Sequence, residues 1–361
     1  MKRITVKIGS NVLTRDDGTL DITRMSALVD QITALHKRGV EVILVSSGAI
    51  TSGRDALRRY NISKKLDPVS ARQIYSAVGQ AKLINRYYDL FRERGIACGQ
   101  VLTMKENFST RRHYLNQKHC MEVMLDNGVI PVVNENDTAS VTELMFTDND
   151  ELSGLIASMM NAQALVILSN VDGVYDGDPG DPGSKVILSV SPGAQLDSGS
   201  FIQKKKSTFG RGGMGTKYRI AQKVADEGIP VVIANGTREN ILLDIASRER
   251  RVPYTRFDAA QKPVSNVKKW IAHSEGFAKG ALTVNEGAYQ ALTSAKASSL
   301  LPVGVTSVEG EFEKDDIVRI IAPDGTPFAV GRVSCDSRQA AATAGHQGGR
   351  PLIHYDYLYI D

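Results

Sequence analysis

The 361-residue sequence has few cysteines, a single tryptophan and no long apolar run. Its three cysteines, Cys98, Cys120 and Cys335, are far apart and form neither a C-x-x-C pair nor a Cys/His spacing suited to zinc. This pattern excludes a disulfide scaffold and a zinc finger, and it favours the reduced cytoplasm. Nowhere do about 18 apolar residues follow one another, so we expect no membrane-spanning helix. Lys7 interrupts the N-terminal apolar stretch, so we expect no secretory signal.

Strong charge of one sign is also lacking. The formal net charge is +4, and we expect the densest basic cluster, Lys204 to Lys206, to be a solvated loop. Residues 266–361 carry nine lysines and arginines against eleven aspartates and glutamates, a net charge of −2. Because nucleic-acid binding depends on cations that neutralise phosphates, this tail is a poor candidate for RNA binding.

The first 245 residues or so alternate between two kinds of pattern. Short β-branched runs predict buried strands, and apolar residues at helical spacing predict helices between them. The predicted strands are RITVKI, VEVILVS, IACGQVLT, VIPVVN, ALVILS and PVVIAN, and the predicted helices cover 22–35, 73–94, 113–127, 151–161 and 218–227. This alternation implies an α/β fold with a mainly parallel sheet sandwiched by helices.

The pattern changes near Arg248. The segment RERRVPYTRFDAAQKPVS is polar and contains two prolines, which is typical of a linker. Beyond it, GALTV, DIVRII and FAVGRVS are short strand-like runs separated by turn signals. We therefore predict a catalytic domain over 1–250, a linker over 251–265 and a small, mostly β domain over 266–361.

Polar clusters follow four of the predicted strands. They are Lys7, Gly9, Ser10 and Asn11; Ser46, Ser47 and Gly48; Asn134, Glu135, Asn136 and Asp137; and Ser169 and Asn170. Ordinary turn and cap roles explain any one cluster by itself. Since ligands of open parallel sheets bind at the carboxyl ends of the strands, four clusters at one edge predict a ligand site there.

Two further segments precede predicted helices. Asp148, Asn149 and Asp150 come in succession, although one such residue is enough for a helix cap. The stretch GRGGMGTK has the spacing of a Walker A loop but ends in Gly-Thr-Lys, and no convincing strand precedes it. We expect instead an anion site made by the N–H groups of residues 212–215 and a helix N-terminus, with Lys217 in the first turn.

Two lysines occupy positions that are unfavourable without an anion. Lys217 near a helix N-terminus costs a few tenths to about 1 kcal/mol unless an anion compensates. Lys7, at the end of a buried strand, must extend to water or find a negative partner. The alternatives are that Lys7 is an ordinary lysine reaching the surface, or that Lys7 and Lys217 converge on one phosphate with Asp150 between them.

Taken in order, these motifs resemble the amino acid kinase family. VKIGSNVLT, SSGAI, AVGQ, NENDT, DNDELS and GGMGTK are similar to motifs of the branch that acts on L-glutamate. The tail, SSLLPVGVTSVEGEFEKDDIVRIIAPDGTPFAVGRVSCDS, resembles the PUA domain attached to many bacterial members of that branch. The resemblance implies ATP-dependent phosphorylation of the glutamate side-chain carboxylate, the first step of proline biosynthesis.

The resemblance also implies residue roles. Lys7 and Lys217 would bind the ATP phosphates, and Asp150 would organise both lysines. The glutamate would contact Ser47, Asn134, Asp137 and Asn149; the nucleotide would contact Lys7, Ser169, Asn170, Arg211, Gly212, Gly213, Met214, Gly215, Thr216 and Lys217. The family commonly has Thr-Asp in place of Ser169-Asn170 and a small or hydroxyl residue in place of Arg211, which leaves the details of nucleotide recognition open.

The proposed nucleophile needs no general base, because a side-chain carboxylate with a reference pKa near 4.3 is ionised at neutral pH. All six histidines lie outside the motifs, and we assign none of them to catalysis. Asp137 is acidic where the substrate ammonium could bind, with Asn134 beside it. Mg²⁺ is expected to be carried mainly by ATP, without metal ligands from the chain.

Two kinds of alternative stay open. The chain could act on N-acetylglutamate, aspartate, carbamate or UMP, although the PUA-like tail argues against all four. It could also be an RNA-binding or RNA-modifying protein acting through that tail, although the tail is acidic. The family resemblance implies a homodimer or homotetramer, feedback inhibition by proline, and the next enzyme of proline synthesis as a candidate partner.

Overall fold

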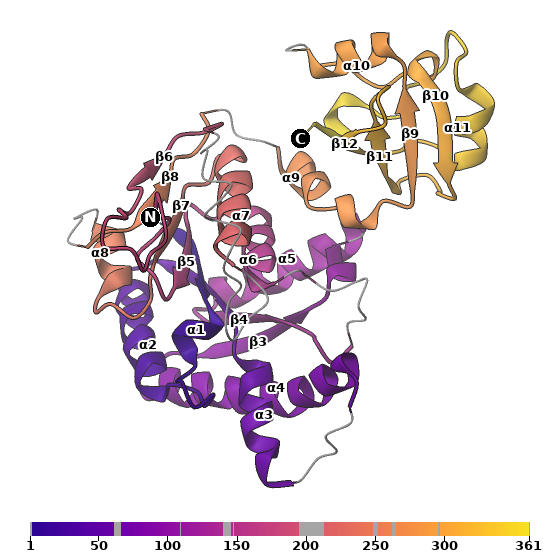
Figure 1. Ribbon diagram of the computed structural model, residues 1–361. Coiled ribbons are helices and arrows are strands. Elements are labelled where there is room, and N and C mark those ends of the chain that lie inside the picture. The colour runs from indigo at the N-terminus through magenta and orange to yellow at the C-terminus, as the bar shows by residue number, and fades with distance from the viewer. Residues whose placement is uncertain are drawn as a thin grey trace. The chain divides into compact units, whose positions relative to one another are not determined.

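The computed structural model describes residues 2–60, 66–108, 110–139, 146, 148–194, 213–247, 252–261, 265–294 and 297–360. The chain divides into two compact units (Figure 1). The first consists of Met1–Lys105 and Asn116–Pro263, and the second of Glu106–Leu115 and Val264–Asp361. No helix within the described ranges is long and apolar enough to cross a membrane.

The first unit is built on a sheet whose described part has eight strands in the order β3-β4-β2-β1-β5-β7-β8-β6. The strands are β1 (Arg3–Ile8), β2 (Glu41–Ser46), β3 (Cys98–Thr103), β4 (Ile130–Glu135), β5 (Leu165–Ser169), β6 (Ser189–Val190), β7 (Val231–Asn235) and β8 (Thr255–Phe257). Strands β1 to β5 and β7 pair in parallel, and β8 runs antiparallel to β7. All six strands predicted for this domain are confirmed.

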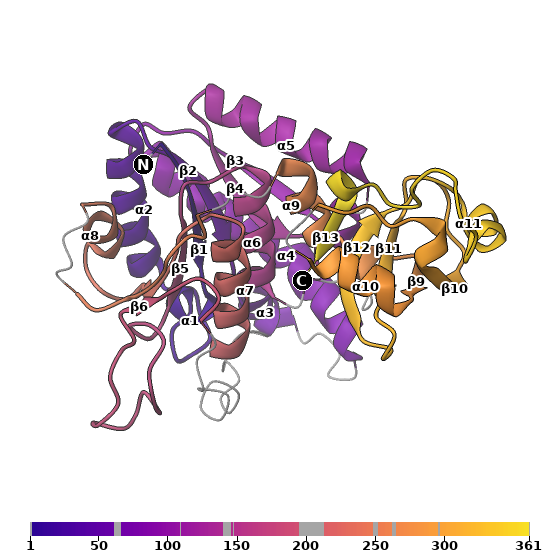
Figure 2. The same cartoon turned by 90° about the horizontal axis from the view of Figure 1, so that it is seen from above.

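Helices cover both faces of this sheet. The helices are α1 (Ser10–Leu13), α2 (Ile22–Lys37), α3 (Ala49–Leu57), α4 (Pro68–Arg92), α5 (Arg111–Asp126), α6 (Asn149–Met159), α7 (Met214–Asp226) and α8 (Ile241–Ser247). Val166 and Leu168 of β5 pack in the core of α2, α4 and α8, whereas Leu165 and Ile167 pack in the core of α6 and α7. Figure 2 shows α6 and α7 side by side, away from α2 and α8. The predicted sandwich of helices around a mainly parallel sheet is confirmed.

The prediction of a linker over 251–265 is wrong for three residues, which form a strand. Thr255–Phe257 forms β8, which pairs with both β7 and β6. Thr255 and Phe257 are buried while Arg256 is exposed, as expected for side chains that alternate across a strand. Three residues next to a proline are too few to give a periodic pattern, so the sequence did not reveal this strand.

The second unit is built on a five-stranded sheet in its described part, with the order β10-β9-β11-β12-β13. The strands are β9 (Gly280–Val284), β10 (Val305–Gly310), β11 (Ile317–Ile321), β12 (Pro327–Arg332) and β13 (Leu358–Ile360), and the helices are α9 (Asn266–Ala272), α10 (Glu286–Thr293) and α11 (Ser337–Thr343). The three strands predicted here correspond to β9, β11 and β12. A small, mostly β domain is therefore confirmed.

Candidate active site

Strand β1 lies between β2 and β5, at the point where the chain turns from one half of the sheet to the other. In open parallel sheets, ligands bind outside the carboxyl ends of the strands at such a point. The polar residues that follow β2 and β4 lie on one side of β1, and those that follow β5 lie on the other. Lys7, near the end of β1, is therefore at the centre of this edge.

Lys7 and Lys217 share the carboxylate of Asp150. Ile4, Val6 and Ile8 pack with α2, so strand alternation directs Lys7 toward the opposite face, where α6 and α7 lie. Its Nζ is 2.5 Å from Asp150 Oδ1, and Lys217 Nζ donates to Asp150 Oδ2 at 3.0 Å. Lys7 is therefore buried and paired with Asp150 instead of reaching the surface, and binding of a phosphate by the two lysines stays a prediction.

Two ammonium groups share the Asp150 carboxylate, and the charge of Asp148 acts on both lysines as well. Burial alone would raise the pKa of Asp150, but Lys7 and Lys217 outweigh burial and hold that pKa below its usual value. Asp150 is therefore ionised at neutral pH. Two buried ammonium groups held side by side by one carboxylate are suited to bind an anion such as phosphate.

Asp148 caps the helix that carries Asp150. Its Oδ1 accepts hydrogen bonds from the backbone N–H groups of Asp150 and Glu151, at 2.9 and 3.1 Å. The ordinary N-cap role is thus correct for this first member of the acidic segment. Burial and the neighbouring Asp150 charge raise the pKa of Asp148 to about 6, although Lys7 and Lys217 oppose that rise.

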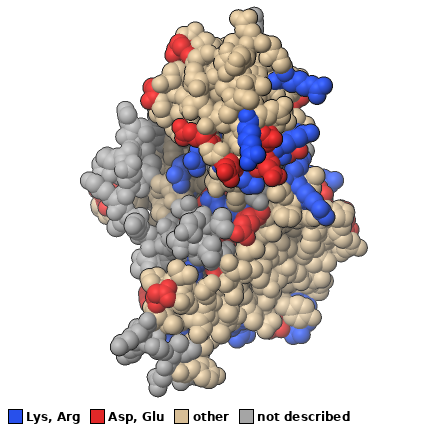
Figure 3. Space-filling model, turned by 90° about the vertical axis from the view of Figure 1, so that its right-hand side faces the viewer, with Lys and Arg blue, Asp and Glu red and all other residues tan. Residues whose placement is uncertain are grey.

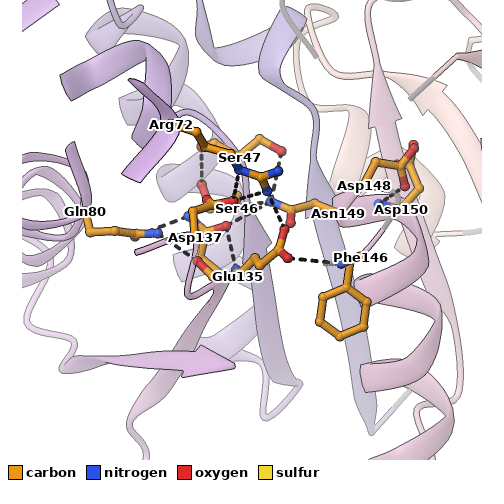
Figure 4. Close-up of polar contacts among 11 residues, drawn as sticks. Ser46, Ser47, Arg72, Gln80, Glu135, Asp137, Phe146, Asp148, Asn149 and Asp150 are labelled. Carbon is orange, nitrogen blue, oxygen red and sulfur yellow. Dashed lines mark hydrogen bonds and ion pairs between the residues drawn. The ribbon is translucent and has the colours of Figure 1, made fainter. Parts of the chain in front are cut away.

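Asn149 joins the ends of β2 and β4. Its amide Nδ2 donates to Ser46 O at 3.0 Å, to Ser47 Oγ at 3.2 Å and to Asn134 Oδ1 at 2.9 Å. In Figure 4, Asn149 lies between the Asp148–Asp150 end and the side chains at the end of β4. The structure therefore brings Ser47, Asn134 and Asn149 together, next to the lysine cluster.

Arg72 of α4 is a site residue that the sequence analysis missed. Its Nε donates to Asp137 Oδ1 at 2.6 Å and its Nη2 donates to Glu135 Oε2 at 2.9 Å (Figure 4). Gln80, on the same face of α4, donates from Nε2 to Glu135 O at 2.9 Å. The sequence does contain a signal for this role of Arg72. Arg72, Ser76 and Gln80 recur every four residues, which places three polar side chains on one face of the helix.

On the other side of β1, Ser169 is the last residue of β5 and Asn170 follows it, with Ser169 buried and Asn170 exposed. Gly213 is the N-cap of α7 and provides no side-chain cap, an arrangement in which the first N–H groups of a helix can bind an anion. Met214, Gly215 and Thr216 form the first turn before Lys217. Arg211 and Gly212 lie outside the described residues, as does the segment that leads into them.

The fold and the two lysines at this sheet edge are typical of an α/β phosphotransferase. Residues 2–235 match the model of the amino acid kinase family, and the chain belongs to that family. Residues 280–351 match the model of the PUA domain. Both resemblances found in the sequence are confirmed.

Close relatives cover nearly the whole chain. It is 65% identical to the glutamate 5-kinase of Bacteroides thetaiotaomicron over 359 residues, which are 99% of this chain and 98% of that protein. It is 49% identical to the glutamate 5-kinase of Chlorobaculum tepidum over 360 residues, 99% of this chain and 97% of that protein. Among solved structures, that of isopentenyl phosphate kinase covers 71% of this chain and 99% of its own, at 18% identity and a TM-score of 0.49.

Proposed function

We propose that the chain transfers the terminal phosphoryl group of ATP to the side-chain carboxylate of L-glutamate. The products are ADP and L-glutamyl 5-phosphate, and the reaction is the first step of proline biosynthesis. The observation that carries this proposal is the pair of charged clusters at one sheet edge. In one cluster two ammonium groups, those of Lys7 and Lys217, share the Asp150 carboxylate; in the other, two carboxylates, those of Glu135 and Asp137, share the Arg72 guanidinium.

A substrate with an anion at one end and a cation at the other fits this arrangement. The glutamate ammonium is placed at Asp137, and the side-chain carboxylate lies toward Lys7 and Lys217, next to Ser47, Asn134 and Asn149. A carboxylate is ionised at neutral pH and attacks phosphorus without a general base. The relatives named as glutamate 5-kinases support this substrate.

The two lysines stabilise the charge on the phosphoryl group during transfer. Because they are held by a buried carboxylate before ATP binds, little reorganisation is needed when negative charge develops. Ser169, Asn170, Arg211 and the 212–216 segment are proposed to hold the nucleotide. Among the described residues, no group of three or more His, Cys, Asp or Glu is placed to hold a metal ion, and Mg²⁺ is proposed to arrive with ATP.

RNA binding through the second unit is not favoured. Residues 266–361 have a net charge of −2. On the face shown in Figure 3, lysine and arginine side chains are interspersed with aspartate and glutamate, without a broad surface of positive charge. Nucleic-acid affinity depends on such a surface.

Three properties are proposed on the basis of the family. They are a homodimer or homotetramer, a cytoplasmic location, and contact with the next enzyme of proline synthesis. Proline is proposed to inhibit by competing with glutamate, because it carries an ammonium and a carboxylate at the same spacing as the α-groups of glutamate.

One assay tests the activity. ATP consumption is measured with L-glutamate, N-acetylglutamate, aspartate and UMP side by side, and hydroxylamine traps the acyl phosphate as a hydroxamate. We expect rapid consumption and hydroxamate formation with L-glutamate alone. Turnover with UMP or N-acetylglutamate and none with glutamate would overturn the proposal.

A further inference from the structure

The Arg72–Glu135–Asp137 cluster has a feature that the transfer reaction does not explain. One guanidinium holds two carboxylates, and the three residues are only 8, 3 and 5% exposed, in that order. Glu135 is fixed from a second direction, because its Oε1 accepts the backbone N–H of Phe146 at 3.0 Å. The two carboxylates are thus held close together whether or not a ligand is bound.

Two ionised carboxylates and one guanidinium leave one buried negative charge unmatched. Such a charge is costly, so a proton or a second cation neutralises it. Among the described residues, the charged groups that act on Glu135 are Asp137 from the loop after β4 and Arg72 from α4. Around them lie the uncharged groups Ser46 at the end of β2, Ser47 after it, Thr103 of β3 and Asn149 of α6. Asp148, the N-cap of α6, and Asp150 instead face Lys7 and Lys217.

In the free protein a proton is available for this role near neutral pH. Burial and the neighbouring Asp137 charge raise the pKa of Glu135 to about 7, although Arg72 opposes that rise. Burial also raises the pKa of Asp137. When a substrate ammonium binds at Asp137, it supplies the second positive charge, and the proton is no longer needed.

We propose that Glu135 and Arg72 determine specificity for the substrate's α-ammonium group, and that binding of glutamate releases to solvent the proton shared by Glu135 and Asp137. The charge stays balanced, since one cation enters as one proton leaves. Arg72 is a positioning residue that holds both carboxylates. This inference rests on the proposed function and deepens it.

The exchange predicts a stronger rejection of an acetylated substrate than a single carboxylate would. N-acetylglutamate has a neutral amide nitrogen, so it cannot replace the proton. When that substrate binds, Glu135 and Asp137 either keep their proton or retain a buried negative charge that no cation balances. Specificity for the ammonium group thus arises from the two carboxylates together. Arg72 offsets their mutual repulsion and keeps them close to each other.

The direct test is isothermal titration calorimetry of L-glutamate into the full-length protein at pH 7.0 and 8.0. Each pH is measured in two buffers of different ionisation enthalpy, which gives the number of protons released. The wild type should release about half a proton per glutamate at pH 7 and about a tenth at pH 8, as follows from a pKa of about 7. Glu135→Gln should release none at either pH.

A matched control is Glu41→Gln. Glu41 is also a glutamate paired with an arginine, with Arg3 Nε at 2.6 Å, but it lies at the amino-terminal end of its strand, opposite the site. This variant should release protons as the wild type does. The wild-type measurement alone tests the proposal if Glu135→Gln does not fold.

Steady-state kinetics provide a second readout. The Michaelis constant for glutamate should rise about tenfold from pH 8 to pH 6 in the wild type, while the turnover number changes by less than that factor. In Glu135→Gln the Michaelis constant should be flat within about twofold over this range. Arg72→Gln should shift the midpoint to higher pH, because the carboxylates lose their compensating cation.

Two results would overturn the proposal. One is glutamate binding at pH 7 without proton release in the wild type. The other is unchanged proton release in folded Glu135→Gln. In both cases the chain would still phosphorylate glutamate, so the proposed function would stand. If the wild type neither binds nor phosphorylates glutamate, both ideas fall.

Discussion

At the scale of single residues, Lys7 and Lys217 differ from surface lysines in sharing a buried carboxylate. Both ammonium groups lie within 3.0 Å of an oxygen of Asp150, whose side chain is 1% exposed. Their geometry is therefore fixed before ATP binds. A preorganised donor of this kind contributes mainly in the transition state.

We predict that Lys7→Ala and Lys217→Ala each lower the turnover number by about 100-fold to 1000-fold, with a much smaller effect on the Michaelis constant for glutamate. The measurement is steady-state kinetics together with a thermal melt, which separates lost chemistry from lost folding. Lys279→Ala is the control, because Lys279 pairs with Asp316 at 3.0 Å but is 59% exposed. Near-normal turnover in either active-site variant would remove that lysine from the phosphate site.

Asp137 should show the opposite kinetic signature. We predict that Asp137→Asn raises the Michaelis constant for glutamate by about thirtyfold or more and changes the turnover number little. The ammonium contact is the same before and during transfer, so it contributes to binding alone. The kinetics are measured at saturating ATP, and an unchanged Michaelis constant would mean that the ammonium binds elsewhere.

The sequence predicted the strand-end residues of the site but not the residue that reaches them from a helix. Ser47 and Asn134 were predicted because polar residues at the end of a buried strand are conspicuous, and Asn149 because it stands in a run of three cap-like residues before a helix. Arg72 lies within a 25-residue helix, where a polar residue normally faces solvent. Its burial becomes evident only once the face it shares with Leu83 is known to pack on the sheet.

At the scale of elements, the position of Arg72 and Gln80 depends on how closely α3 and α4 approach each other. A Cβ on Gly79 would lie 1.7 Å from Ala49 O, and a Cβ on Gly53 would lie 1.8 Å from Tyr75 O. Both obstacles are backbone atoms, which cannot rotate away. Glycine at these two positions therefore sets the distance between the helices.

We predict that Gly79→Ala destabilises the protein by about 1 to 3 kcal/mol and raises the Michaelis constant for glutamate more than that for ATP. The helices must separate, which withdraws Arg72 and Gln80 from the end of β4. Denaturant unfolding and steady-state kinetics give the two quantities. Gly287→Ala in α10 is the control, since its nearest atom would be 3.6 Å away. If the two variants have equal stability and kinetics, the close approach of α3 and α4 tolerates an added methyl group and the prediction is wrong.

Element prediction from the sequence succeeded where the pattern was long. The six buried strands and five long helices of the first unit were found, with ends displaced by a few residues. Strands β6 and β8 have two and three residues and were missed, because so short a segment has no period. Strand β8 pairs with β7 and β6 pairs with β8, so each forms only against another segment of the chain.

At the scale of the whole molecule, the two units do not correspond to two continuous pieces of chain. Glu106–Leu115, between β3 and most of α5, belongs to the second unit. Trp270 Nε1 donates to Phe108 O at 2.9 Å, and the Arg111 guanidinium lies over the rings of Tyr114 and Trp270 at 5.1 and 5.8 Å. Phe108, Tyr114 and Trp270 are all at most 3% exposed.

Removal of residues 264–361 tests how much the packing of these residues on the 106–115 segment contributes to stability. Every described residue to which we assign chemistry lies in the first unit, so the truncated chain should retain turnover at low temperature. It would, however, expose Phe108 and Tyr114, each worth about 1.5 to 3 kcal/mol of burial. We therefore predict that its melting temperature falls by about 6 to 24 °C relative to the first unit in the full chain.

The full-length variant Trp270→Phe separates the two contributions to this effect. The variant keeps an aromatic ring over residues 106–115 but loses the hydrogen bond to Phe108 O. We expect the free energy of unfolding to fall by only about 1 kcal/mol for the lost bond, plus the cost of the reduced ring volume. A truncated chain that melts with the full-length protein would show that residues 106–115 need no covering. A truncated chain that is folded but inactive at low temperature would instead show that the second unit helps to form the active site, because packing loss alone cannot remove turnover from a folded site.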